Sequence, residues 1–289
     1  MNDTAWRERA LVFPCGDNRL VGIVAEPAHS PGAGTGVVIL VGGPQYRVGS
    51  HRQFTLLARD LAAAGFPSLR FDYSGMGDSE GDQREFSETS EDLSAAITAF
   101  QAAVPGVARL VLWGLCDAAS SAMMFAHQHA QVSGLVLLNP WVHGVEYSPE
   151  VKLSHYYRPL IRTGENWSRL FKGKIDVLPA MKEFLDSSLR WVAGWFGMSG
   201  GAPSRHSFVQ QMLDGLSRFK RPSLVILSED DLTAREFSSL VARDAKWAAL
   251  LDTPQVSRRT VAGADHTFSR RVWSREVSRL TIDWIRRNA

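Results

Sequence analysis

Short apolar segments alternate with amphipathic segments along most of the chain. The short segments are four to seven residues long, and most are rich in Val, Ile and Leu, which is typical of strands. They comprise residues 9–13, 20–26, 36–41, 66–71, 110–113, 134–139, 222–227 and 255–261. The segments between them predict helices over residues 51–64, 118–124, 234–250 and 272–287, and one more that starts near Glu88 and ends near Pro105.

This alternation predicts an α/β fold with a mostly parallel sheet flanked by helices. Strands that alternate with helices form parallel sheets with helices on both faces. Segment 36–41 is apolar throughout, as expected for an interior strand that is covered on both sides. The first two segments flank the turn-forming residues 15–18, so we expect them to pair as antiparallel strands.

The alternation is interrupted between residues 141 and 217, where we find no strand pattern. We therefore expect a helical cap at 141–217, inserted into a core made of residues 1–140 and 218–289. Within the cap the pattern predicts a helix over 179–196 and a loop over 197–207. The aromatic residues of that helix fit an acyl-chain pocket, a membrane surface or ordinary packing on the core, and the loop fits a hinge or a plain connection.

Composition excludes several classes of protein. A length of 289 residues suits one large domain with an insertion, and a formal charge of +2 without a basic run argues against a nucleic-acid binder. The N-terminal segment lacks the apolar core of a signal peptide, and we expect no membrane span. The two cysteines, Cys15 and Cys116, are too few for a disulfide framework. We expect a cytoplasmic protein with reduced thiols and no metal or cofactor.

Residues 114–118, with the sequence Gly-Leu-Cys-Asp-Ala, lie between a predicted strand and a predicted helix. This is the form of a nucleophile elbow, with Cys116 where serine is more common. The apex of such a turn has a strained backbone, so the positions two before and two after it must be small. Gly114 and Ala118 meet that requirement. The alternative is a cysteine that simply packs at the end of a strand.

A cysteine nucleophile needs a histidine base and a third group that orients the base. In this architecture the order along the chain is nucleophile, acid, histidine, which Cys116, Asp231 and His266 provide, each just after a predicted strand. Asp230 competes with Asp231 for the role of the acid, and we prefer Asp231. Asp265, next to the histidine, fits a solvated loop charge.

A thiol at a helix start beside a protonated imidazole favours the thiolate, which would attack an acyl carbon and form a thioester. The oxyanion then needs backbone donors, and we expect one to be the N–H of Asp117. The second should come from the loop at 42–45; Pro44 has no N–H, so we choose Gln45, with Gly43 as the alternative. The candidate substrate-binding residues are Arg47, His51 and Trp141, although the two basic residues also fit solvated loop charges.

The segments GGPQ, RFDYSGMGDSEG, GLCDA and GADHTF together resemble the α/β-hydrolase superfamily. More narrowly, GGPQYRVGSHRQF, WGLCDAAS, LNPWV and DLTAREF resemble the exosortase A system-associated hydrolases (type 1), bacterial proteins encoded with exopolysaccharide and protein-sorting machinery. The resemblance implies the α/β-hydrolase fold, hydrolase activity and a triad of Cys116, His266 and Asp231. It identifies no substrate. Cys in place of Ser, and Ala118 in place of Gly, depart from the wider superfamily.

These observations predict an acyl hydrolase of esterase or thioesterase type that acts through an acyl-Cys116 intermediate. The expected partner is a small-molecule acyl ester or thioester. One alternative is an acyltransferase, which would pass the acyl group to an alcohol, a sugar or a polymer. Another is a catalytically silent or redox-sensing scaffold with the same fold.

Overall fold

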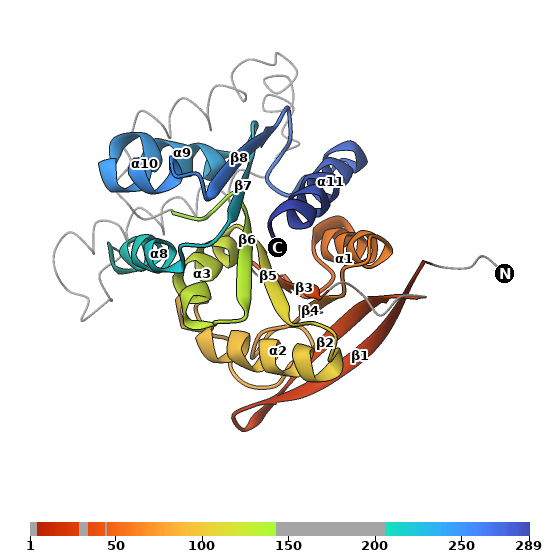
Figure 1. Cartoon of the computed structure of the whole chain (residues 1–289). Helices are drawn as coiled ribbons and strands as arrows, with labels where there is room; N and C mark the ends of the chain where they lie inside the picture. Colours follow the sequence, from red (N-terminus) through yellow and green to blue (C-terminus); the bar gives the residue numbers. More distant parts are fainter. Residues whose placement is uncertain (1–4, 29–33, 44, 143–205) are drawn as a thin grey trace, which may run out of the picture. The chain divides into compact units, whose positions relative to one another are not determined.

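An eight-stranded sheet forms the centre of the computed structural model, which describes residues 5–28, 34–43, 45–142 and 206–289 (Figure 1). The strands lie in the order β1-β2-β4-β3-β5-β6-β7-β8. Their bounds are β1 Trp6–Cys15, β2 Asn18–Pro27, β3 Thr35–Leu40, β4 Ser68–Phe71, β5 Arg109–Leu115, β6 Val132–Leu138, β7 Ser223–Ser228 and β8 Val256–Val261.

Most of the sheet is parallel, as the alternating pattern predicts. The β1–β2 hairpin and the β2–β4 pair are antiparallel, and every other neighbouring pair of strands is parallel. Every strand from β3 to β8 therefore points the same way, and the carboxyl ends of these strands share one edge of the sheet. Ligands in open sheets of this kind bind beyond that edge.

Helices cover both faces of the sheet. Their bounds are α1 Gln53–Ala63, α2 Ser90–Ala103, α3 Asp117–Phe125, α8 His206–Phe219, α9 Leu232–Arg243, α10 Ala245–Leu251 and α11 Arg271–Asn288. Helices α1 and α11 lie side by side on one face, and α2, α3 and α8 lie across the sheet from them (Figure 1). Every residue of β3 is buried between these layers, which explains its unbroken apolar sequence.

Two predicted helices differ from the observed ones. The predicted helix 234–250 is two helices, because Asp244 is extended and its carboxylate accepts hydrogen bonds from the N–H groups of Lys246 and Trp247, which starts α10. The predicted helix 51–64 begins two residues later as α1. Residues 51 and 52 have φ values of 53° and 61°, which an α-helix does not accommodate.

Helix α8 is not among the helices that we expect from the sequence, and its first twelve residues lie in the range that we assign to the cap. Its apolar residues Met212, Leu213, Leu216 and Phe219 are buried, and Phe208 packs edge-to-face on Phe86 at 5.3 Å. The chain divides into one unit of residues 1–143 and 208–289 and another of 144–207. Residues 143–205 of the predicted cap, with the predicted helix at 179–196 and almost all of the loop at 197–207, lie outside the described residues.

The tightest connection at the carboxyl edge joins β5 to α3 through Cys116. A Cβ atom at position 114 would lie 2.7 Å from the carbonyl carbon and oxygen of Ala118 and 2.8 Å from the nitrogen of Ala119. These are backbone atoms, which cannot move aside without displacing the helix. The prediction that position 114 must be small is therefore confirmed, and the contact is close enough to exclude any side chain there.

We expect Gly114→Ala to destabilise the fold by about 1–3 kcal/mol, because the added methyl group overpacks the β5–α3 contact. Urea unfolding followed by circular dichroism measures the change. Gly34→Ala is the matched control, since a Cβ there meets no atom within 4 Å, and its effect should stay within about 0.5 kcal/mol. Equal effects of the two substitutions would contradict the steric argument.

Candidate active site

Cys116 lies at the apex of the turn from β5 to α3, at the carboxyl edge of the sheet. Its backbone has φ 64° and ψ −127°, a region that non-glycine residues rarely adopt. The surrounding backbone holds it there: its N–H donates to the carbonyl of Leu138 at 2.9 Å, and its carbonyl accepts from the N–H of Trp141 at 3.2 Å. Trp141, a predicted substrate-binding residue, is thus bonded through its backbone to Cys116. Strain maintained in this way is typical of functional positions.

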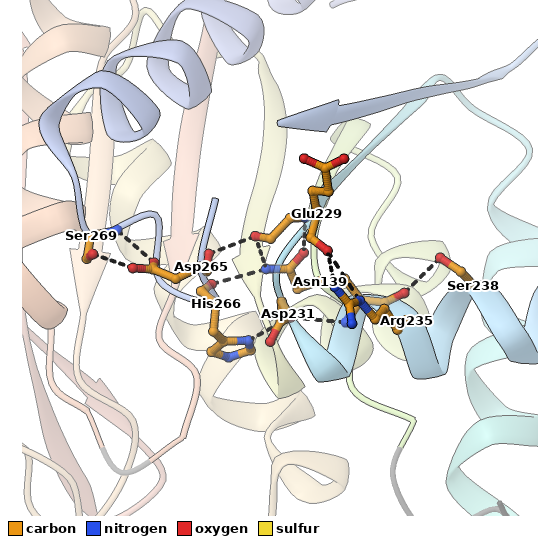
Figure 2. Close-up of polar contacts among 10 residues, drawn as sticks. Asn139, Glu229, Asp231, Arg235, Ser238, Asp265, His266 and Ser269 are labelled. Carbon is orange, nitrogen blue, oxygen red and sulfur yellow. Dashed lines mark hydrogen bonds and ion pairs between the residues drawn. The ribbon is translucent and has the colours of Figure 1, made fainter. Parts of the chain in front are cut away.

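His266 and Asp231 follow two other strands and meet at the same edge. The imidazole Nδ1 of His266 lies 3.0 Å from Oδ2 of Asp231 (Figure 2). That same carboxylate oxygen accepts a hydrogen bond from the N–H of Ala234 at 3.0 Å, which caps the start of α9. The carboxylate is therefore oriented by the helix, and the imidazole is oriented by the carboxylate.

The protonation of His266 depends on the two groups beside it. Burial disfavours the imidazolium, but hydrogen bonds and negative charge from Asp231 and Cys116 outweigh burial and raise the pKa of His266 to about 10. Since Nδ1 faces Asp231, Nε2 is the nitrogen left for Cys116. The structure thus brings Cys116, His266 and Asp231 together, although they are far apart in sequence.

The two neighbouring acids have other partners. The Asp230 side chain is 65% exposed, compared with 7% for Asp231, and pairs with Arg235 at 3.3 Å. Asp265 accepts hydrogen bonds from the N–H and the hydroxyl of Ser269, so it stabilises the loop that carries the histidine. Within the described residues, neither Asp230 nor Asp265 forms a hydrogen bond or an ion pair with the His266 imidazole.

Asn139 supports this loop from the end of β6, a role that the sequence pattern does not reveal. It is fully buried, and its amide nitrogen donates to the Ser228 hydroxyl at 2.8 Å and to the His266 carbonyl at 3.1 Å. Its amide oxygen accepts from the Ser228 N–H at 2.8 Å, and the Ser228 hydroxyl donates to the Asp265 carbonyl at 2.8 Å (Figure 2). The ends of β6 and β7 are thereby tied to the histidine loop. Asparagine tolerates the left-handed φ of 42° at this position.

The backbone N–H groups of Gly43 and Gln45, the two residues considered for the second oxyanion donor, have different partners. The N–H of Gly43 donates to both carboxylate oxygens of Asp117, at 2.7 and 2.9 Å, so it lies at the first turn of α3. The N–H of Gln45 donates to the Gly43 carbonyl at 2.8 Å instead. The Gln45 side chain accepts a hydrogen bond from the N–H of Ser50 at 2.9 Å.

The basic residues of this loop are placed differently from one another. The Arg47 guanidinium pairs with the fully buried Asp72 and with Asp78, so its donors bind carboxylates of the protein itself. His51 is exposed in a short 3₁₀ helix that precedes α1. In the part of the chain that the structure describes, the side chains of Arg47 and His51 form no hydrogen bond with the residues around Cys116.

A cavity of about 590 Å³ adjoins Gly43 and Asp117. Its wall also includes Tyr73, Gln83, Arg84, Glu85, Glu88 and Thr89. In the described ranges, we find no cluster of three His, Cys, Asp or Glu side chains suited to a metal ion. Among the described helices, none is both long and apolar enough to cross a membrane.

Comparison with known proteins shows a family and a fold. The family model described as "Serine aminopeptidase, S33" matches residues 34–183, a range that includes Cys116 and ends before Asp231 and His266. No curated protein sequence matches the chain.

Solved structures share the fold at low sequence identity. An esterase from Pyrococcus furiosus is 16% identical with a TM-score of 0.63, covering 99% of this chain and 94% of its own. Est1E from Butyrivibrio proteoclasticus, solved with ferulic acid, is 13% identical with a TM-score of 0.61, covering 96% and 100%. Dienelactone hydrolase from Anabaena variabilis is 15% identical with a TM-score of 0.59, covering 98% and 99%. The predicted α/β-hydrolase fold is confirmed.

We expect Asn139→Ala to lower the free energy of unfolding by roughly 2–4 kcal/mol, because it leaves the buried Ser228 N–H and the His266 carbonyl without their partner. Chemical unfolding measures the loss. Asn288→Ala, which removes one side-chain hydrogen bond at the end of α11, is the control and should change stability by less than about 1 kcal/mol. A neutral Asn139→Ala would contradict the role that we assign to this amide.

We expect Asp231→Asn to lower the pKa of His266 toward its usual range, because it removes the charge that stabilises the imidazolium. NMR titration of the imidazole measures the change, with Asp230→Asn as the control that leaves the pKa unaltered. Because the pKa of His266 is raised in the folded state, its protonation stabilises the protein below pH about 6.5. That stabilisation is lost as the pH rises to about 10. The wild type should therefore lose stability relative to Asp231→Asn over that interval.

Proposed function

The chain belongs to the serine aminopeptidase S33 family, and on that basis we propose that it is an acyl hydrolase that cleaves ester or thioester bonds through an acyl-Cys116 intermediate. The placement of His266 between Asp231 and Cys116 carries this proposal. A nucleophile beside a base that a third group orients is the arrangement for acyl transfer. The neighbours named esterase and dienelactone hydrolase support an ester substrate.

Acylation starts from a Cys116 thiolate paired with the His266 imidazolium. The sulfur attacks the acyl carbon, a carbon–sulfur bond forms, and the carbonyl oxygen becomes an oxyanion. When the tetrahedral intermediate collapses, the bond to the leaving group breaks and the leaving group takes a proton from His266. The raised pKa of His266 keeps that proton available at neutral pH.

Deacylation needs the same histidine to act as a base. Once Cys116 is a neutral thioester, its charge no longer raises the pKa of His266, so that pKa falls and only Asp231 still opposes the effect of burial. Water then attacks the thioester carbon and gives a proton to His266. Collapse breaks the carbon–sulfur bond, releases the carboxylic acid and restores the thiolate–imidazolium pair.

The proposed oxyanion donors are the N–H groups of Asp117 and Gly43. Asp117 is the first residue of α3, where backbone N–H groups have no partner within the helix. We propose Gly43 in place of Gln45, because the Gly43 N–H reaches the first residue of α3, whereas that of Gln45 is bonded within its own loop.

The motif resemblance supports a narrower assignment. We propose that the protein is an exosortase A system-associated hydrolase, with a cap near residues 141–217 that contributes, together with Trp141, to binding the acyl substrate. Arg47 and His51 are weaker candidates for substrate binding, since Arg47 already pairs with two carboxylates. Both cysteines are free thiols, which supports a reducing compartment such as the cytoplasm.

Two other functions share this fold and are separated by experiment. An acyltransferase would make more product when an alcohol or sugar acceptor is added, whereas a hydrolase would release the same amount of acid. A silent or redox-sensing scaffold would have a Cys116 that alkylates no faster at neutral pH than a free thiol.

We expect brief exposure to a series of chromogenic esters to add one acyl mass to the wild type and none to Cys116→Ala. Cys116→Ala should also lower turnover at least about 1000-fold, because it removes the nucleophile. Intact mass spectrometry detects the adduct, and the preferred acyl length indicates which substrates are admitted.

Cys15→Ala is the matched control for this experiment. Cys15 is buried, its thiol donates to Asp92 at 3.2 Å, and burial together with that carboxylate raises the pKa of Cys15 to about 11. The Cys15 variant should therefore acylate like the wild type. Turnover retained by a folded Cys116→Ala protein would falsify the assignment.

A further inference from the structure

The Asp117 side chain folds back onto the donors that the proposed reaction uses. Its two carboxylate oxygens accept the Gly43 N–H at 2.7 and 2.9 Å. Burial raises the pKa of Asp117, and this is opposed by hydrogen bonds from the backbone N–H groups of Gly43, Ala118 and Asp117 itself. One of the two proposed oxyanion donors, the Gly43 N–H, is therefore already bound to this carboxylate.

The chain around Asp117 leaves room for its carboxylate. A Cβ at position 42 would lie 2.5 Å from Oδ1 of Asp117 and 2.4 Å from the carbonyl oxygen of Leu115. Only glycine at position 42 allows the carboxylate to sit against the Gly43 N–H. The site is thus shaped to accept an anionic oxygen, and the protein itself supplies one.

The carboxylate also has a place to which it can move. Asp117 lines the cavity of about 590 Å³, and so does Tyr73, whose hydroxyl is buried and makes no hydrogen bond of normal geometry with the described residues. Burial and then the charge of Asp117 raise the pKa of the Tyr73 hydroxyl. A change of the Asp117 side-chain rotamer beside this cavity would release the Gly43 N–H.

We propose that the Asp117 carboxylate occupies the oxyanion site of the resting protein and that a substrate carbonyl must displace it before attack by Cys116. This inference rests on the proposed function, since it takes Gly43 and Asp117 as the oxyanion donors. Displacement is a step that precedes binding of any carbonyl at the site. It therefore reduces kcat/KM by the same factor for every uncharged ester, in proportion to the fraction of protein in which the site is open.

Asp117→Ala tests this proposal and keeps the backbone N–H of residue 117. We expect kcat/KM to rise at least about tenfold and by one common factor across neutral esters of different acyl length, because a charge-assisted hydrogen bond no longer competes. Asp117→Asn keeps a neutral acceptor and should show a smaller rise. A fall in kcat/KM, no change, or a rise confined to one acyl length would overturn the proposal.

Acetate provides a second measurement that needs no turnover. With the carboxylate removed, acetate should bind the vacated donors, raise the Tm of Asp117→Ala and inhibit that variant competitively, at constant ionic strength. Acetate should neither raise the Tm of the wild type nor inhibit it. If acetate fails to stabilise a folded Asp117→Ala protein, the proposal is wrong even where ester turnover is intact.

Asp244→Ala is the matched control, because Asp244 also supplies a carboxylate to a helix start and lies in the α9–α10 connection. The Asp244→Ala variant should have a lower free energy of unfolding than the wild type. Its kcat/KM should not rise, and acetate should not raise its Tm. If no ester is turned over by the wild type or any variant, the proposed function fails, whereas stabilisation of Asp117→Ala by acetate still tests the occupied site by itself.

Discussion

The contact between Gly114 and the first turn of α3 is the constraint on which the candidate active site depends. Strand and helix approach so closely that no side chain fits at position 114. The chain can then reverse direction within one residue, which leaves Cys116 in a left-handed conformation at the edge of the sheet. Helix α3 begins at the next residue, Asp117. The proposed nucleophile and the proposed oxyanion donor of Asp117 thus both follow from one steric arrangement.

The carboxylates of Asp231 and Asp117 affect different parts of this candidate site. Asp231 accepts the Ala234 N–H at the start of α9 and contacts His266, so its charge favours the imidazolium. Asp117 accepts the Gly43 N–H, and we propose that it competes there with a substrate carbonyl. A charge with little water around it interacts more strongly with its few partners, which is the physical basis of both roles.

Much of the fold is predictable because it depends on short-range pattern. The strand pattern gives all eight strands of the described sheet, most of them within two residues of the observed ends. The inner strands such as β3 are the clearest, because burial on both faces requires unbroken apolar sequence. The helices that differ from our expectations do so for different reasons. Asp244 ends one helix and starts another through its side chain. Helix α8 has its buried apolar residues at helical spacing, so its pattern is in the sequence, and our assignment of residues 141–217 to a cap overlooks it. The predicted cap at 141–217 stays a prediction.

The sequence by itself determined the candidate chemistry: a cysteine between small residues, followed by an acid and a histidine after later strands, in the order that this architecture requires. Only the tertiary structure decided which groups meet. It distinguishes buried Asp231 from exposed Asp230, places the Gly43 N–H rather than that of Gln45 at α3, and engages Arg47 with Asp72. These outcomes depend on distances between segments far apart along the chain, which no local pattern encodes.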